Sequence, residues 1–242
     1  MQVDSRRERA GPGRHGLVWQ VLAGALSTVT VAGRRPAVLD CGGGSGSFAV
    51  PLAETGAEVT VVDISADALA TLRRRAAESG VGALVRAVQG DVETLAGIVA
   101  PASFDLVLAH GILESVDELG ATFAAIAGTV RTGGLLSVLI GNPVAAVLAR
   151  ALSGDVAGAL AELRGLDTAL PRPGPAGVQA LCRSHGLHVE QVHGVGVFSE
   201  LVPGASLDVP GARAALAELE FEAAVRPPFA DIASRVHVLA RR

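Results

Sequence analysis

The sequence predicts an α/β fold: a doubly wound, mostly parallel seven-stranded sheet with helices on both faces and a helical cap. Three observations support this. Short apolar runs alternate with stretches of helical periodicity along the chain. The runs are almost continuously apolar, as expected for strands that are covered on both faces. A turn with four glycines within residues 42–46 follows the first run, which places a close backbone approach at a strand end.

Each element follows from its local pattern. Strands are expected at 37–39, 58–62, 83–88, 104–109, 135–140, 187–198 (a candidate for a strand pair) and 235–240. Helices are expected at 16–31, 46–54, 66–79, 115–130, 175–185 and 211–224. Ser65 is expected to cap the third of these helices. The segment "SVDE", Ser115 to Glu118, is typical of a capping box and is expected to open the fourth helix.

Two segments lie outside this alternation within a single expected domain, 1–242. Residues 1–31 form an N-terminal arm and a helix, and residues 143–172 read as an inserted cap segment with one or two helices and a proline-rich loop. The insertion directly follows the fifth strand, and such segments beside strand ends carry specificity. We therefore expect residues 1–15 and 143–172 to cover the ligand edge of the sheet.

Composition narrows the class of protein. Half of the 242 residues are hydrophobic and the net charge is -4, so the protein as a whole does not attract nucleic acid. Cys41 and Cys182 are far apart and indicate neither a disulfide framework nor a metal site. The uncharged stretch 132–149 is long enough for a membrane span, but Gly133-Gly134 and Asn142-Pro143 interrupt it. We expect a cytoplasmic protein with no membrane span and no metal.

The glycine-rich turn is the first candidate binding site. In doubly wound sheets, ligands bind beyond the carboxyl ends of the strands. The first strand ends at Asp40, so Gly42, Gly43 and Gly44 lie where backbone can come close to a ligand. The G-x-G-x-G spacing departs from a dinucleotide fingerprint, because Ser47 stands at its last position; this counts against NAD or FAD. An ordinary strand-to-helix turn is the alternative.

Two acidic residues extend the candidate site. Asp63 ends the second strand, 21 residues after Gly42, and its carboxylate can accept hydrogen bonds from both hydroxyls of a ribose. Asp91 follows the third strand and can accept from an adenine amino group, although a solvated turn explains it equally well. Asp40, at the end of the first strand, and Ile64 and Val92, which follow the two acids, also belong to the expected cofactor-binding set.

These motifs occur in a familiar order. The segments "VLDCGGGSG", "VVDIS", "QGDV", "FDLVLAHGILESV" and "RTGGLLSV" resemble those of class I S-adenosylmethionine-dependent methyltransferases from Val38 to about Ile140. The resemblance implies S-adenosylmethionine as cofactor. It places the methionine part in the first loop, the ribose at Asp63 and the adenine at Asp91. "RTGG" stands where the family usually has "PGG".

A second, narrower resemblance includes segments before and after these motifs. Arg14 with "HGLVWQVL", then "AHGILESV", "GNPVAAVLARALSGD" and "SRVHVLARR", is similar to the subfamily that methylates the carboxyl of 5-carboxymethoxyuridine at the tRNA wobble position. This implies that Arg14 contacts the cofactor carboxylate and that His110 lines the cofactor site. The inserted segment departs from the subfamily, because its charges are balanced rather than basic.

The sequence thus predicts an S-adenosylmethionine-dependent methyltransferase and leaves the acceptor open. One acceptor is the carboxyl of a modified wobble uridine in tRNA, and the other is a carboxyl or hydroxyl of a small molecule. A non-catalytic cofactor-binding module is a further alternative. A carboxylate needs no base, whereas a hydroxyl favours one, and His110 and Glu114 are the candidates by position. Alternatively, Glu114 is only a charged residue at the start of the helix that follows it. The sequence leaves the oligomeric state open.

Overall fold

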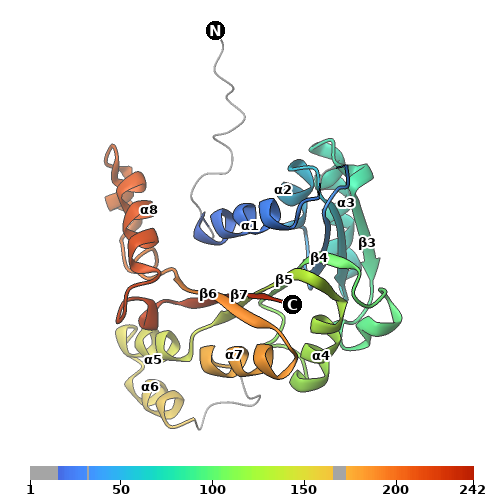
Figure 1. Ribbon diagram of the computed structural model, residues 1–242. Coiled ribbons are helices and arrows are strands. Elements are labelled where there is room, and N and C mark those ends of the chain that lie inside the picture. The colour runs from blue at the N-terminus through green and yellow to red at the C-terminus, as the bar shows by residue number, and fades with distance from the viewer. Residues whose placement is uncertain (1–15, 32, 166–172) are drawn as a thin grey trace.

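The computed structural model describes residues 16–31, 33–165 and 173–242. It contains a seven-stranded sheet with the order β3-β2-β1-β4-β5-β7-β6 (Figure 1). The strands are β1 (Ala37–Cys41), β2 (Glu58–Asp63), β3 (Val85–Gln89), β4 (Phe104–His110), β5 (Val130–Gly141), β6 (His188–Val195) and β7 (Arg235–Arg241). Strands β1 to β5 pair in parallel, and β7 runs antiparallel to both β5 and β6. The predicted doubly wound, mostly parallel sheet is confirmed.

Helices cover both faces of the sheet (Figure 1). One face carries α1 (Gly16–Val29), α2 (Ala49–Glu54) and α3 (Ala66–Glu78), whose apolar residues form one core cluster with the strands. The other face carries α4 (Leu119–Thr129) and α7 (Pro175–Ser184), which belong to a second cluster. The sheet therefore separates two cores.

Strand β4 shows why the strand sequences are continuously apolar. Leu106 and Leu108 pack into the core on the α1 side, while Val107 and Ala109 pack into the core on the α4 side. Successive side chains in a strand point to opposite faces, so a strand with two covered faces needs apolar residues at every position. Two residues leave this pattern: Asp105 near the amino end and His110 at the carboxyl end, where ligands bind.

The carboxyl end of β5 leads into a group of helices. Helices α5 (Pro143–Leu152) and α6 (Val156–Leu163) follow β5, and α8 (Ala212–Ala223) lies in the connection from β6 to β7 (Figure 1). Asn142 starts α5: its side-chain oxygen accepts from the Val144 N–H at 3.1 Å. The expected inserted segment thus forms two helices after β5, with 166–172 outside the described residues. That it covers a bound cofactor stays a prediction.

The amino ends of three strands are joined by a buried carboxylate. Asp105 accepts two hydrogen bonds from Arg34, both at 2.7 Å, and one from Arg131 at 2.8 Å. It also accepts from the Ala37 N–H at 2.7 Å. Burial opposes the charge of Asp105, but these donors, Arg34 foremost, hold its pKa below the ordinary value. This cluster ties β1, β4 and β5 together at the end opposite the site.

The predicted capping box at Ser115 to Glu118 is wrong. Helix α4 begins at Leu119, and the Ser115 hydroxyl donates instead to the Ile112 carbonyl at 2.9 Å. The N–H groups of Asp117 and Glu118 donate to Oε1 of Glu93, at 2.8 and 3.1 Å. A carboxylate from another part of the chain therefore satisfies the donors that precede the helix, and the local box does not form.

Other boundaries also shifted. Residues 42–48 form turns, so the helix expected from residue 46 begins at Ala49. Strand β5 already begins at Val130 and includes the expected "RTGG" turn, with a register irregularity opposite Phe104 and Leu106. The candidate strand pair within 187–198 is one strand, β6, because all its pairing is with β7.

Within the described ranges, no helix is long and apolar enough to cross a membrane. The uncharged stretch 132–149 is divided between β5 and α5 at Asn142-Pro143, as predicted, whereas the turn expected at Gly133-Gly134 lies within β5. The same described ranges contain no group of three or more His, Cys, Asp or Glu residues that could hold a metal. The cytoplasmic location stays a prediction.

Candidate active site

A cavity lies at the carboxyl ends of β1, β2 and β3. It has a volume of about 310 Å³. Five of the predicted cofactor-binding residues line it together: Gly42, Asp63, Ile64, Asp91 and Val92. The remaining wall comes from Gly90, Glu93, Ile112, Ser115, Val116 and Asp117. The fold therefore brings the glycine loop and both acidic strand ends to one place.

Asp63 fixes the glycine loop against the end of β2. Its Oδ2 accepts from the Gly44 N–H at 2.8 Å, and its Oδ1 accepts from the Ser65 N–H at 2.8 Å. Each carboxylate oxygen has a second lone pair, so the group can hold the loop and still accept from two ribose hydroxyls.

Two positions of the glycine loop have backbone angles that favour glycine. Gly42 and Gly44 have φ of +68° and +54°, in the left-handed region that side chains with a Cβ rarely adopt. A Cβ at Gly42 would lie 2.8 Å from the Ile112 side chain, in the wall of the cavity. At Gly44 the nearest atom would be Oδ2 of Asp63 at 3.8 Å, so the surface of the loop there is open.

Asp40 lies beneath the loop. Its side chain is buried, and Oδ2 has no hydrogen-bond partner among the described residues. A Cβ on Gly43 would lie 2.4 Å from that oxygen. Burial, with the nearby charge of Asp63, raises the pKa of Asp40 to about 7. An unsatisfied buried acceptor is costly, and a cationic donor at the loop would relieve it. The amino group of S-adenosylmethionine is such a donor, so the residues fit this cofactor.

The adenine side of the cavity is shaped by Ile64 and Asp91. The Ile64 side chain is 72% exposed next to Asp63 and offers an apolar surface to a flat ring. Asp91 Oδ1 accepts from the Glu93 N–H at 2.9 Å, and its other oxygen can accept from an adenine amino group. Val92 lines the cavity, and its side chain packs into the second core cluster.

The two candidate catalytic residues stand outside the described lining of this cavity. His110 ends β4, and its Nε2 lies 2.8 Å from the Ser137 hydroxyl. Glu114 lies between β4 and α4, and its Oε1 accepts from the Gly141 N–H at 2.6 Å. Because α4 begins at Leu119, Glu114 is not a helix-entry charge. Their catalytic roles stay predictions, and Arg14 lies outside the described residues.

The structure adds residues that sequence reasoning missed. Phe48 directly follows the glycine loop and places its ring edge-on to His110, with 4.6 Å between ring centroids. Trp19 of α1 stacks on Phe48, with 5.0 Å between ring centroids. Glu93 holds the segment after β4 that forms one wall of the cavity. No local pattern marks Phe48 or Glu93, because both roles depend on contacts that are distant in sequence.

Comparisons with known proteins agree with this geometry. The family model described as "Methyltransferase domain" matches residues 39–138. A tRNA 5-carboxymethoxyuridine methyltransferase from Escherichia coli is 26% identical over 95% of this chain and 88% of its own length. A ubiquinone biosynthesis O-methyltransferase from Xanthomonas euvesicatoria is 34% identical over 68% of this chain and 67% of its own.

Solved structures share the fold. Magnesium protoporphyrin IX methyltransferase from Synechocystis, solved with bound S-adenosylhomocysteine, superposes with a TM-score of 0.61 at 16% identity, covering 100% of this chain and 89% of that one. A structure described as a sarcosine dimethylglycine methyltransferase from Galdieria sulphuraria also gives 0.61, at 14% identity, covering 94% and 84%. With the glycine loop, Asp63 and Asp91 around one cavity, this chain belongs to the class I S-adenosylmethionine-dependent methyltransferases.

Proposed function

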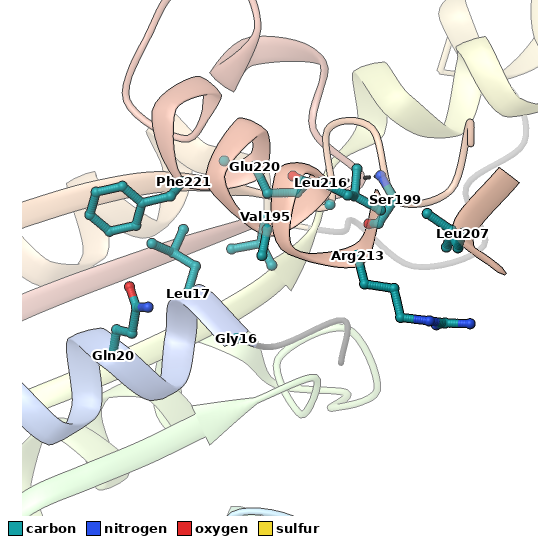
Figure 2. A pocket seen from close by; sticks show the side chains of 13 residues that line it. Gly16, Leu17, Gln20, Val195, Ser199, Leu207, Arg213, Leu216, Glu220 and Phe221 are labelled. Atoms are coloured by element: carbon teal, nitrogen blue, oxygen red, sulfur yellow. Dashed lines mark hydrogen bonds between the residues drawn. The ribbon is translucent and has the colours of Figure 1, made fainter. Parts of the chain in front are cut away.

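We propose that this methyltransferase transfers the methyl group to an oxygen of a small, largely apolar molecule. The observation that carries the proposal is a second cavity, of about 420 Å³, between α1, the end of β6 and α8 (Figure 2). Its apolar wall comes from Leu17, Val195, Leu207, Leu216, Ala217 and Phe221. Pockets for small ligands typically have this size and a mainly apolar lining with a few polar groups.

The polar groups of this acceptor pocket are few. Gln20, Ser199, Arg213 and Glu220 contribute to the lining, and Figure 2 shows the Arg213 side chain extending toward the Leu207 end. Glu220 is already engaged: it accepts from the N–H groups of Val197, Phe198 and Ser199, at 2.8, 2.8 and 2.5 Å. Arg213 has one exposed ion pair, to Asp208 at 3.4 Å, and its remaining N–H groups can meet a polar group of the acceptor.

Helix α1 connects the acceptor pocket to the cofactor side. Leu17 and Gln20 line the pocket, while Trp19 on the same helix stacks on Phe48 after the glycine loop. Phe48 in turn contacts His110. A molecule in the pocket would thus extend along α1 toward the carboxyl ends of β1 and β4.

Methyl transfer from this cofactor requires few catalytic groups from the protein. S-adenosylmethionine supplies an activated methyl group, so the chain must align an oxygen with it and exclude water. A hydroxyl oxygen becomes a better nucleophile when it loses its proton, and His110 at the end of β4 is the candidate acceptor of that proton. Glu114, held by Gly141, would orient the segment after β4. The relatives named as O-methyltransferases support an oxygen acceptor.

A second candidate acceptor is the carboxyl of 5-carboxymethoxyuridine in tRNA. It is favoured by the relative of that name, whose similarity extends over 95% of this chain. A carboxylate is already ionised and needs no base. Phosphate contacts dominate binding to nucleic acid, but the acceptor pocket offers one guanidinium and one carboxylate rather than a basic surface. The geometry therefore favours the small molecule.

The test is methyl transfer from tritium-labelled S-adenosylmethionine. The acceptors are a panel of pocket-sized phenols and carboxylic acids and, separately, tRNA that carries 5-carboxymethoxyuridine. We expect label in a phenol. Leu216→Arg should abolish this labelling and leave cofactor binding unchanged, because Leu216 lines the acceptor pocket.

A matched control lies on the same helix. Leu219 is 46% exposed and outside the described lining of the acceptor pocket, so Leu219→Arg should keep full activity. Labelled tRNA with no labelled small molecule would overturn the proposal in favour of the second candidate. Equal activity of the two variants would show that the acceptor binds elsewhere.

A further inference from the structure

Four polar side chains form a row beneath α1. They come from four adjacent strands: His110 from β4, Ser137 from β5, His237 from β7 and His193 from β6. The register pairs His237 with His193 and places Leu139 of β5 opposite both His110 and His237. The four side chains therefore share one face of the sheet.

The row is continuously hydrogen-bonded. His110 Nε2 lies 2.8 Å from the Ser137 hydroxyl, which lies 2.8 Å from His237 Nε2. His237 Nδ1 lies 3.4 Å from His193 Nδ1, and the two rings stack at 5.7 Å. Ser137 and His237 are fully buried within a core cluster that includes Leu135, Leu139 and Leu239. Polar groups in such surroundings cost free energy unless they satisfy one another.

The single hydroxyl proton of Ser137 allows only two arrangements of the row. In one, His110 donates from Nε2 to Ser137, Ser137 donates to His237 Nε2, and His237 donates from Nδ1 to His193. In the other, every hydrogen bond is reversed. A neutral imidazole carries a proton on one ring nitrogen and a lone pair on the other. One arrangement therefore converts into the other when one proton moves along each of the three bonds, one proton enters His110 at Nδ1 and one proton leaves His193 at Nε2.

The two ends of the row meet different surroundings. His110 lies at the carboxyl end of β4, against Phe48 beside the glycine loop. His193 is 9% exposed and lines a third cavity, of about 430 Å³, between α1 and strands β6 and β7. Glu190 and Arg241 also line this cavity and form an ion pair there. This cavity shares Leu17, Gln20 and Phe221 with the acceptor pocket, and water in it can exchange protons with His193.

We propose that His110, Ser137, His237 and His193 are a proton relay that carries the proton of a hydroxyl acceptor from the carboxyl end of β4 to the cavity beside β6. The inference rests on the proposed function, since a carboxylate acceptor releases no proton. The acceptor oxygen forms the new C–O bond as the C–S bond of the cofactor breaks, and the electron pair of that bond stays on sulfur.

The proton then moves stepwise. The proton enters His110 at Nδ1, a buried atom that the acceptor oxygen has to reach when it binds. The Nε2 proton then passes to Ser137, the hydroxyl proton to His237, and the Nδ1 proton of His237 to His193, which releases one proton to water. The reverse movement after the products leave restores the first arrangement. Burial, with the neighbouring His193, lowers the pKa of His237 to about 3, so His237 passes a proton on without storing charge.

The relay can be tested in the free protein, without any acceptor. Long-range proton–nitrogen NMR spectra of the ¹⁵N-labelled protein report which ring nitrogen of His110 carries the proton. His193→Leu removes the last partner of the row. We expect the tautomer ratio of His110 to change by about fivefold, which corresponds to a net hydrogen bond of about 1 kcal/mol. His188→Leu, at an exposed position on the same strand, should leave the ratio unchanged.

Ser137 provides the decisive comparison. In Ser137→Ala the His110 ratio should no longer respond to His193→Leu, and Ser137→Thr, which keeps the hydroxyl, should restore the response. An unchanged His110 ratio in His193→Leu, or a response that persists in Ser137→Ala, would overturn the relay. Because these spectra need no acceptor, a relay that fails here is distinct from a failure to methylate a phenol.

Discussion

Replacing Asp40 by Asn should change how the stability of the protein depends on pH. The Asp40 carboxyl is fully buried beneath Gly43, and Oδ2 is without a partner among the described residues. Burial, together with the charge of Asp63, raises its pKa from 3.8 to about 7. Asparagine has nearly the same shape and no charge at any pH, so it removes this titration and little else.

The direction and the size of the change in stability with pH follow from the raised pKa of Asp40. Between pH 3.8 and about 7 the folded protein holds a proton on Asp40 that the unfolded chain has lost. Unfolding therefore releases a proton, and stability falls as the pH rises through this range. A rise of about three pKa units, at about 1.4 kcal/mol each, gives a loss of about 4 kcal/mol at pH 8 relative to pH 4.

Urea unfolding of the wild-type protein and of Asp40→Asn at pH 4, 6 and 8 measures this loss. As the pH rises, the unfolding free energy of Asp40→Asn should increase relative to that of the wild-type protein. The total change should be about 4 kcal/mol and should level off above pH 7. Asp67→Asn, at an exposed position in the first turn of α3, is the control. A difference that is the same at all three pH values would refute the interpretation of Asp40 as a buried, unsatisfied acid.

Three further predictions concern cofactor binding. Asp63→Ala should weaken S-adenosylmethionine binding in calorimetry by about tenfold or more, because hydrogen bonds to a charged group contribute about 1.5–3 kcal/mol, while the protein stays folded; unchanged affinity would contradict the ribose contact. Gly42→Val should abolish binding, because its φ is +68° and its Cβ would meet Ile112; full affinity would show that the loop does not touch the ligand. Arg14→Ala should lower cofactor affinity and leave the melting temperature of the free protein unchanged, since a guanidinium matches a carboxylate; an equal affinity would count against the expected N-terminal contact.

The sheet could be predicted because its signals are local. Runs such as "EVTVV" and "FDLVLA" are mostly apolar, and the structure shows why: adjacent residues of β4 pack into different cores. Asp63 and Asp91 could be predicted because parallel strands place their carboxyl ends at one edge. Both line the same cavity as Gly42.

The features that escaped prediction depend on contacts between distant residues. Glu93 supplies the acceptor for the N–H groups before α4, so the local Ser115 signal was misleading. The row from His110 to His193 requires the pairing of β5 with β7 and of β7 with β6, and strand register cannot be derived from a single sequence with no turn between the partners. The acceptor pocket likewise joins α1 to α8, which are far apart along the chain.

We infer that S-adenosylmethionine binds at the carboxyl ends of the strands, between the glycine loop and the two acidic strand ends. Its methyl group then points toward the α1 side of the sheet. A crystal structure of the protein with S-adenosylhomocysteine tests this most directly. We expect the ribose on Asp63, the adenine between Ile64 and Asp91, the amino group above Asp40, and the sulfur on the side of Phe48 and His110. S-adenosylhomocysteine bound outside this cavity, or with its ribose away from Asp63, would contradict it.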